Sequence, residues 1–103
     1  MADFTGRTAI VTGATRGIGR ALAETLLHRD CTVVGTYGSS KEEAERFQQQ
    51  WAKNKLHLVR CDVADHDQVQ RFYQDFEARF ENLDILINNA GVRRDAIVAL
   101  MSS

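Results

Sequence analysis

Three closely spaced glycines that follow an apolar run constrain the fold of this chain most. Gly13, Gly17 and Gly19 come directly after the apolar residues 8–11, and an apolar pattern with helical spacing begins at Ile18. A strand, a glycine turn and a helix in this order form the setting in which backbone N–H groups can hold a phosphate. The segment therefore predicts a nucleotide-binding loop. A turn that only connects the strand to the helix is the alternative.

Each glycine has a separate expected task in such a loop. Gly13 can take the positive φ of a tight turn, because glycine has no Cβ. The missing Cβ of Gly17 would let a pyrophosphate approach the backbone, and that of Gly19 would let the helix pack closely on the strand. The helix N-terminus then offers N–H groups and the positive end of its dipole to the phosphates. The spacing G-x-x-x-G-x-G differs from the commonest dinucleotide fingerprint, G-x-G-x-x-G.

The rest of the chain alternates predicted strands and helices. Helical apolar spacing predicts three helices between four apolar runs. Continuous apolar runs predict buried strands at residues 7–12, 31–36, 56–59 and 84–88. The order βαβαβαβ favours an α/β fold of the Rossmann type, with a parallel sheet, strand order 3-2-1-4 and helices on both faces.

Local signals add detail at the helix ends and at the end of the chain. Ser40 with Glu43, and Asp65 with Gln68, have the capping-box spacing and predict the starts of the second and third helices. Residues 95–101 predict the beginning of another helix. Without a further strand, the fourth strand would be an exposed edge of the sheet.

Composition and charge narrow the function classes. The 103 residues suit one domain or part of one; 44% are apolar, 26% are charged and the net charge is −1. The net charge does not suggest binding to nucleic acid, and the N-terminus does not resemble a signal peptide. No apolar run approaches the roughly 20 residues that span a bilayer. We therefore expect a cytoplasmic protein without a membrane or nucleic-acid partner. Cys31 and Cys61 stand at opposite ends of their predicted strands, too far apart for a disulfide. No Cys/His cluster predicts a metal site.

Three motifs together resemble the short-chain dehydrogenase/reductase family. They are TGATRGIG at residues 12–19, Asp62-Val63, and NNAG at residues 88–91. The motifs occur in the family's order, each at the carboxyl end of a predicted strand. The resemblance implies that residues 1–103 are the N-terminal NAD(P)-binding part of a single domain whose C-terminal catalytic part is absent.

The resemblance also implies roles for the residues at the strand ends. Asp62 would bind the adenine amino group, with the Val63 backbone beside it; alternatively, Asp62 only begins the turn before the third helix. Thr12 and Asn88 would tie the strand ends together, and residues 89–91 would line the ribose and the nicotinamide. The expected cofactor-binding residues are Gly13, Ala14, Thr15, Arg16, Gly17, Ile18, Gly19, Gly38, Ser39, Asp62, Val63, Asn89, Ala90 and Gly91.

The residues after the second strand favour NADP(H) over NAD. NAD sites place an acid about 20 residues past the glycines, where it binds the ribose 2′-hydroxyl. Tyr37 stands at that position, and no acid occurs between Asp30 and Glu42. Arg16 can pair with the 2′-phosphate of NADP, although a plain surface arginine is the alternative. The pocket would be completed by Gly38, Ser39 and Lys41.

Within the family, residues 88–92 followed by Arg94-Asp95 are similar to the β-ketoacyl-acyl-carrier-protein reductases of fatty-acid synthesis, as is Thr15-Arg16. This implies reduction of a β-ketoacyl thioester, carried by acyl-carrier protein or CoA, by a full-length enzyme that is a homo-oligomer. Acetoacetyl-CoA reductases share these residues and are the alternative enzyme. Arg93 and Arg94 would face the carrier or form a solvated loop pair. A truncated nucleotide-binding or interaction module without catalysis is the alternative of another class.

The family's catalytic serine, tyrosine and lysine have no counterpart in this sequence. Tyr37 and Lys41 have the Y-x-x-x-K spacing, but they lie in a glycine-serine turn near the expected adenosine end, and Tyr73 belongs to an apolar helix stripe. No partner at motif spacing accompanies the three histidines, His28, His57 and His66. We therefore expect no catalytic residue in this chain and no turnover by it alone.

Overall fold

The computed structural model describes residues 3–89 and 97–100 of the chain. Within these residues, helices and parallel strands alternate in the predicted order, and one more strand follows. The strands are β1 (Thr8–Thr12), β2 (Thr32–Tyr37), β3 (Leu56–Arg60), β4 (Ile85–Asn88) and β5 (Ile97–Leu100), and the helices are α1 (Gly17–His28), α2 (Lys41–Gln49) and α3 (His66–Arg79).

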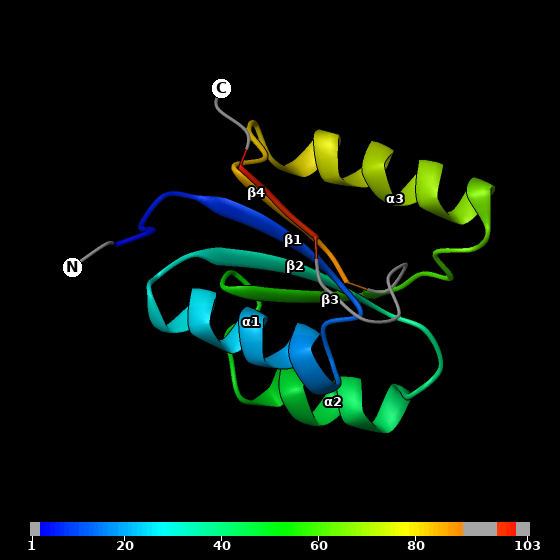
Figure 1. Cartoon of the computed structure of the whole chain (residues 1–103), viewed down its shortest axis with the longest axis horizontal. Coiled ribbons are helices and arrows are strands. Elements are labelled where there is room, and N and C mark those ends of the chain that lie inside the picture. The colour runs from blue at the N-terminus through cyan, green and yellow to red at the C-terminus, as the bar shows by residue number, and fades with distance from the viewer. Residues whose placement is uncertain (1–2, 90–96, 101–103) are drawn as a thin grey trace.

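The strands form one sheet in the order β3-β2-β1-β4-β5. β1 pairs in parallel with β2 and with β4, and β2 pairs in parallel with β3, which confirms the predicted order 3-2-1-4. Helices α1 and α2 cover one face of the sheet and α3 covers the other (Figure 1). Because the four parallel strands point the same way, the segments that follow them meet at one edge of the sheet, where α/β proteins bind ligands.

The helix expected over residues 95–101 is wrong, because Ile97–Leu100 forms strand β5. β5 runs antiparallel to β4, with Leu100 opposite Ile85. A short apolar run suits a strand as well as a helix, and pairing satisfies the backbone N–H and C=O groups along the outer side of β4. β4 is therefore an inner strand, not the exposed edge that the sequence predicted.

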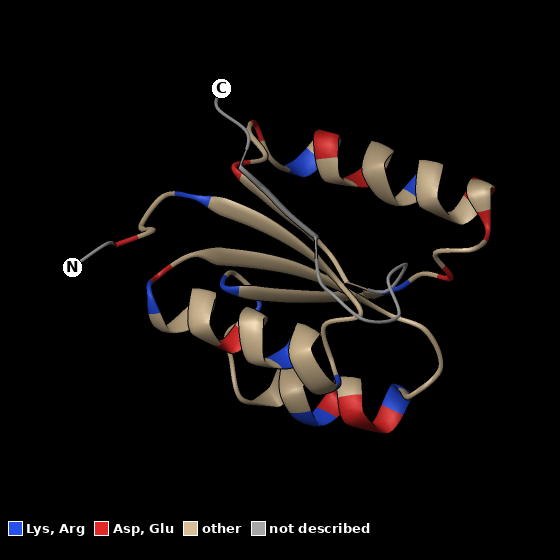
Figure 2. Ribbon diagram, in the orientation of Figure 1, with Lys and Arg blue, Asp and Glu red and all other residues tan. Residues whose placement is uncertain are grey.

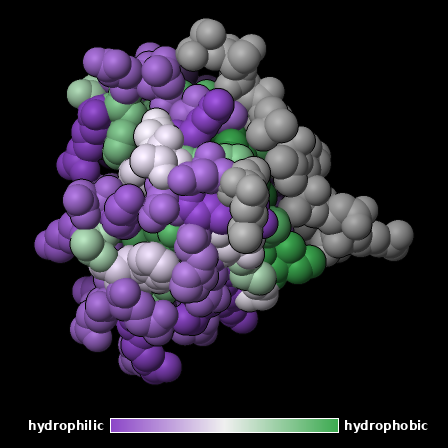
Figure 3. All heavy atoms as spheres, turned by 90° about the vertical axis from the view of Figure 1, so that its left-hand side faces the viewer, coloured by the Kyte–Doolittle hydropathy of each residue, from purple (hydrophilic) through white to green (hydrophobic). Residues whose placement is uncertain are grey.

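Apolar side chains bury both faces of the sheet. Ala9 and Val11 of β1 belong to the cluster under α1 and α2, whereas Ile10 belongs to the cluster under α3. All three are fully buried, which explains why β1 is continuously apolar rather than alternating. Charged residues lie mainly on helices and loops (Figure 2), and the described surface at the amino ends of the strands is mostly hydrophilic (Figure 3).

The two predicted helix caps have different outcomes. Asp65 caps α3 as predicted, because its carboxylate accepts the backbone N–H groups of Asp67 at 3.0 Å and Gln68 at 3.2 Å. Hydrogen bonds from Gln68, above all, lower the pKa of Asp65. Ser40 precedes α2, but its side chain makes no capping hydrogen bond. Its hydroxyl instead lies 3.4 Å from Nη1 of Arg16, so the predicted capping box is wrong there.

A glutamine side chain that was not predicted from the sequence to have a role closes the outer edge of β3. Gln48 of α2 donates from Nε2 to the carbonyl oxygen of Leu56 at 2.6 Å. Its Oε1 accepts the backbone N–H of Leu58 at 3.0 Å. The amide therefore occupies the place that the peptide group of a neighbouring strand would take.

Replacing Gln48 with alanine is expected to lower the free energy of unfolding by about 1–3 kcal/mol, because it leaves two backbone groups of β3 without these partners. Gln49→Ala is the matched control, since Gln49 is the next residue of α2 and is exposed. We expect the control to stay within about 0.5 kcal/mol of the parent chain. Urea denaturation followed by circular dichroism measures both, and equal losses would contradict the bridging role of Gln48.

Candidate functional site

The glycine loop joins β1 to α1 at the carboxyl edge of the sheet. Gly13 has φ 64° and Gly17 has φ 54°, both in the left-handed region, so the positive φ predicted for Gly13 is confirmed. The loop is fixed to the end of β2 by Thr36, a residue that the sequence analysis missed. Its hydroxyl accepts the Gly13 N–H at 3.2 Å, and its carbonyl oxygen accepts the Ala14 N–H at 2.8 Å.

Close packing behind the loop depends on Gly19. A Cβ there would overlap the carbonyl oxygen of Gly13 and lie 2.7 Å from Nδ2 of Asn89. That amide donates to the same Gly13 oxygen at 3.3 Å, so Asn89 braces the glycine loop from the end of β4. Around Gly17, by contrast, a Cβ would have no neighbour within 4 Å. The backbone at Gly17 is therefore open to a ligand.

Thr12 and Asn88 tie the strand ends together, as predicted. Asn88 lies opposite Thr12 in the β1–β4 register. The Thr12 hydroxyl donates to Oδ1 of Asn88 at 3.2 Å. This hydrogen bond joins the carboxyl ends of β1 and β4, and the glycine loop begins directly after β1.

Arg16 reaches from the glycine loop to the segment after β2. Its Nη1 lies 3.4 Å from the Ser40 hydroxyl. Ala14 and Thr15, in the same loop, are buried. A hollow of about 210 Å³, here called the loop hollow, lies between the two segments. It is lined by Gly13, Thr15, Arg16, Tyr37, Gly38, Ser39 and Ser40.

A second hollow of about 610 Å³, here called the β3 hollow, adjoins the first through Gly38 and Ser39, which line both. Its other lining residues are Arg60, Asp62 and Gln68. Asp62 accepts the Ala64 N–H on Oδ1 at 3.0 Å, so it does begin the turn before α3. The Asp62 N–H donates to Oε1 of Gln68 at 2.9 Å, which fixes the turn against α3.

Two exposed apolar side chains stand at the same edge. In the described part of the chain, the large apolar residues with high exposure are Ile18, at 56%, and Val63, at 37%. Ile18 lies in the first turn of α1 and Val63 follows β3, and both were predicted to contact a cofactor.

The structure thus brings most of the predicted site residues to one edge of the sheet. Residues 13–19, 38–39 and 62–63, with Asn89, are placed at the ends of β1, β2, β3 and β4 respectively. Ala90, Gly91 and the pair Arg93-Arg94 lie outside the described residues. Thr36 and Arg60 join the site without having been predicted, because their contacts are with residues more than 20 positions earlier. Gln68, predicted only as the capping partner of Asp65, joins it through its hydrogen bond with Asp62.

The Y-x-x-x-K residues and His57 lie in different parts of the described structure. Tyr37 ends β2, and Lys41, in the first turn of α2, pairs with Glu45 at 3.9 Å. His57 lies 2.9 Å from Nη1 of Arg79 through Nε2. Burial, followed by nearby Arg79 and Lys53, lowers the pKa of His57. A guanidinium can only donate, so Nε2 accepts in this contact.

Both cysteines are unpaired and buried, as predicted. Burial raises the pKa of the Cys31 thiol to about 11, which keeps it protonated and unreactive. In residues 3–89 and 97–100, no group of three His, Cys, Asp or Glu side chains could hold a metal ion. No helix of that described part is long and apolar enough to cross a bilayer.

Comparison with known proteins gives a consistent set of relatives. The profile of the short chain dehydrogenase family matches residues 7–103. The 3-oxoacyl-(acyl-carrier-protein) reductase FabG of Salmonella typhimurium is 40% identical over 99 residues, which cover 96% of this chain and 40% of that protein. Nodulation protein G of a Rhizobium species is 37% identical over 102 residues, covering 99% of this chain and 41% of that protein.

Solved structures are similar over the same region. A short-chain dehydrogenase/reductase from Serratia marcescens superposes with a TM-score of 0.79 at 34% identity, covering 88% of this chain and 38% of that one. The NADP active-site complex of Pseudomonas aeruginosa RhlG superposes with a TM-score of 0.76 at 30% identity, covering 87% and 35%. The chain spans about 40% of the length of the curated relatives it matches. Because the family profile matches nearly all of it, this chain belongs to the short-chain dehydrogenase family.

Proposed function

We propose that this chain is the NADP(H)-binding part of an oxidoreductase of the short-chain dehydrogenase family. Arg16 carries the proposal: its guanidinium reaches the segment after β2, where an NAD site would place a carboxylate. No acidic residue occurs there between Asp30 and Glu42. An arginine without an opposing acid favours a ligand with a 2′-phosphate over one with a 2′-hydroxyl.

The residues at this edge fit a nicotinamide dinucleotide. The pyrophosphate would approach the backbone at Gly17, where no atom lies within 4 Å of a Cβ position and the N-terminus of α1 supplies N–H groups. The adenosine would occupy the two adjoining hollows, with Asp62 near the adenine amino group and Val63 against the ring. The pyrophosphate part of the dinucleotide would cover the exposed Ile18 side chain.

The bound nicotinamide would supply hydride, and this chain's residues would bind and orient the dinucleotide that carries it. Thr36 and Asn89 hold the glycine loop in its binding shape from β2 and β4, before any ligand arrives. Such preorganisation lowers the cost of ordering the loop when the ligand binds. Residues 89–91 would extend the binding surface toward the nicotinamide.

The proposed reaction of the whole protein is reduction of a β-ketoacyl thioester to the β-hydroxyacyl form. The support is the FabG of Salmonella typhimurium, named as a 3-oxoacyl-(acyl-carrier-protein) reductase, together with the FabG-like residues 88–92 and 94–95. In this proposal the carrier is acyl-carrier protein, and the family's serine, tyrosine and lysine lie outside residues 1–103. Reduction of acetoacetyl-CoA is the alternative within the same chemistry.

Arg16→Ala tests the proposed cofactor preference. The parent chain is expected to bind NADP at least about 10-fold more tightly than NAD, since a charge-assisted hydrogen bond is worth about 1.5–3 kcal/mol. The variant should lose about 10-fold in NADP affinity and less than about 2-fold in NAD affinity, measured by titration calorimetry. Arg71→Ala, an exposed arginine of α3, is the control and should change neither. NAD binding as tight as NADP binding in the parent chain would contradict the proposal.

A further inference from the structure

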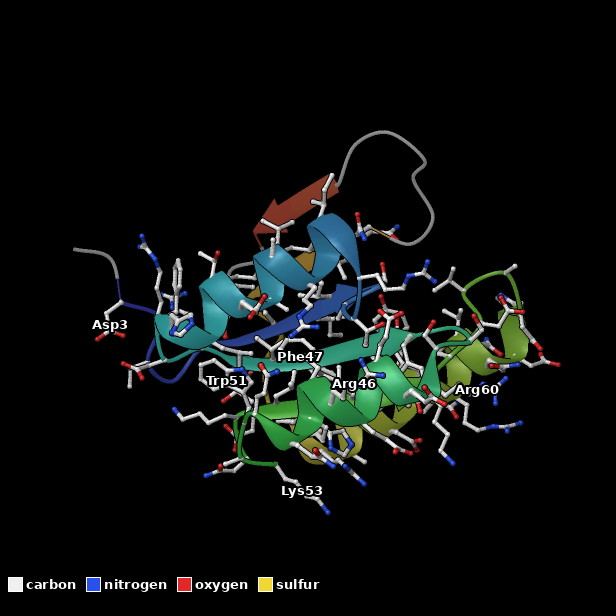
Figure 4. The ribbon with its side chains drawn as sticks, turned by 90° about the horizontal axis from the view of Figure 1, so that it is seen from below. Asp3, Arg46, Phe47, Trp51, Lys53 and Arg60 are labelled. Carbon is white, nitrogen blue, oxygen red and sulfur yellow. The ribbon has the colours of Figure 1, made fainter. Side chains whose placement is uncertain are left out.

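Arg60, the last residue of β3, stands beside the β3 hollow without an assigned task. Leu56 and Leu58 of the same strand pack with the core cluster under α1 and α2. Alternation along a strand therefore places Arg60 on the side of the sheet that α2 covers. The residue is exposed and lies at the end of the molecule where α2 begins (Figure 4).

The Arg60 side chain is held by the loop between β2 and α2. Its Nε donates to the carbonyl oxygen of Gly38 at 3.1 Å. β2 and β3 pair with each other up to this point. Tyr37 lies opposite Arg60 in the β2–β3 register, and the Tyr37 carbonyl oxygen accepts the Cys61 N–H at 3.0 Å. A guanidinium has five N–H donors, so this bond leaves four of them, on Nη1 and Nη2, for a ligand.

No described carboxylate lies within 4.0 Å of the Arg60 guanidinium, since the ion pairs of residues 3–89 involve other arginines and lysines. Asp62 lines the same hollow, but its Oδ1 accepts the Ala64 N–H. Glu42, in the first turn of α2, lies 3.7 Å from Arg46. The positive charge of Arg60 is thus not neutralised by an ion pair in the described structure.

Two arginines therefore hold the same short loop from opposite sides. Arg16 reaches Ser40 from the glycine loop, and Arg60 reaches Gly38 from β3. Ser39 lies between them, is exposed, and lines both hollows. Ser39 therefore joins a hollow lined by Arg16 to one lined by Arg60. A dianionic phosphate is the ligand group that paired guanidinium groups favour.

We propose that Arg60 is a second specificity-determining residue, which binds the 2′-phosphate of NADP(H) from the β3 side while Arg16 binds it from the glycine loop. This inference rests on the proposed function, because it assumes that the adenosine half of a dinucleotide fills the two hollows. It assigns recognition of the phosphate to a pair of arginines rather than to Arg16 alone. Because Arg60 is already held by Gly38, its guanidinium is positioned before the ligand arrives.

The test measures ligand binding by the Arg60→Gln variant with titration calorimetry, and glutamine is chosen over alanine for the following reason. Glutamine can still donate to the Gly38 oxygen but has no charge, whereas alanine removes both the bond and the charge. NADP and 2′,5′-ADP carry the phosphate in question, and NAD and 5′-AMP lack it. Arg60→Gln is expected to weaken binding of the first two ligands about 5- to 20-fold and of the last two less than about 2-fold, as expected for one charge-assisted contact.

Two further variants sharpen the result. Arg79→Ala, at the far end of α3, is the control and should leave all four affinities unchanged. The double variant Arg16→Ala/Arg60→Gln should bring the NADP and NAD affinities to within about 2-fold of each other. The preference of the parent chain for NADP should also fall as the salt concentration rises, since both contacts are electrostatic.

The possible failures are distinguishable. If Arg60→Gln weakens NADP and NAD equally, Arg60 acts on the adenine or on loop shape, and the inference is overturned. If the parent chain prefers NADP and Arg60→Gln keeps that preference, the inference alone fails. If the parent chain binds none of the four ligands, or binds NAD as tightly as NADP, the proposed function fails and this inference fails with it.

Discussion

Gly19→Ala is expected to lower the free energy of unfolding by about 3 kcal/mol or more, the high end of the cost of overpacking. The added Cβ would overlap the carbonyl oxygen of Gly13 and lie 2.9 Å from its carbonyl carbon. Both atoms belong to the backbone, so no side chain can rotate away to make room. Relief requires α1 to move off the end of β1, which would disturb buried residues such as Ala23 and Leu27.

Gly38→Ala is the matched control for this prediction. Gly38 is exposed, has no neighbour within 4 Å of a Cβ position, and is not among the residues with positive φ. Its replacement should stay within about 0.5 kcal/mol of the parent chain. Urea denaturation followed by circular dichroism gives both values. If Gly19→Ala lowers the free energy of unfolding by less than about 1 kcal/mol, the prediction is wrong, and α1 can move away from the glycine loop with little loss of stability.

The parts of the fold that were predicted correctly depend on neighbours in the sequence. Continuous apolar runs identified β1 to β4 because a parallel sheet covered on both faces needs them. Asp65 was identified as the cap of α3 because the N–H groups it accepts, from Asp67 and Gln68, are only two and three residues away. The turn at Gly13 followed from the conformational freedom of glycine.

The parts that were missed depend on contacts made only after folding. Ile97–Leu100 is too short for periodicity to separate helix from strand. The segment forms a strand because it pairs with the otherwise unpaired side of β4. Ser40 fits a capping box in sequence, but its hydroxyl lies against Arg16, which is 24 positions earlier. Gln48 reads as part of a polar run, although the edge of β3 gives its amide two partners.

The candidate site shows the same division. Gly17, Asp62 and Arg16 belong to local motifs, so their side of the site could be predicted. Thr36 and Arg60 could not, because one supports a loop formed 23 residues earlier and the other reaches a loop 22 residues earlier. Nothing in the sequence near either residue distinguishes it from an ordinary strand threonine or a surface arginine.

Phe47→Ala is expected to detach α2 from the sheet and to lower the free energy of unfolding by about 3–5 kcal/mol, the usual range for a buried phenylalanine. α2 has nine residues, too few to be stable alone in water. Its buried residues are Ala44 and Phe47, and Phe47 is fully buried. The Phe47 ring lies between α1 and α2, with the Arg20 guanidinium 4.8 Å from its centroid (Figure 4).

The matched control is Phe76→Ala in α3, where Phe72 is also buried and neighbouring side chains keep packing on the sheet. Both variants should lose stability, but only Phe47→Ala should lose hydrogen-exchange protection of the α2 amides under native conditions. If Phe47→Ala unfolds the whole chain, Phe47→Leu keeps enough stability for the same measurement. Because α2 begins at Lys41, directly after the loop held by Arg16 and Arg60, its release should also weaken NADP binding. Protected α2 amides in Phe47→Ala would mean that Gln48 and Ala44 hold the helix in place without the aromatic ring.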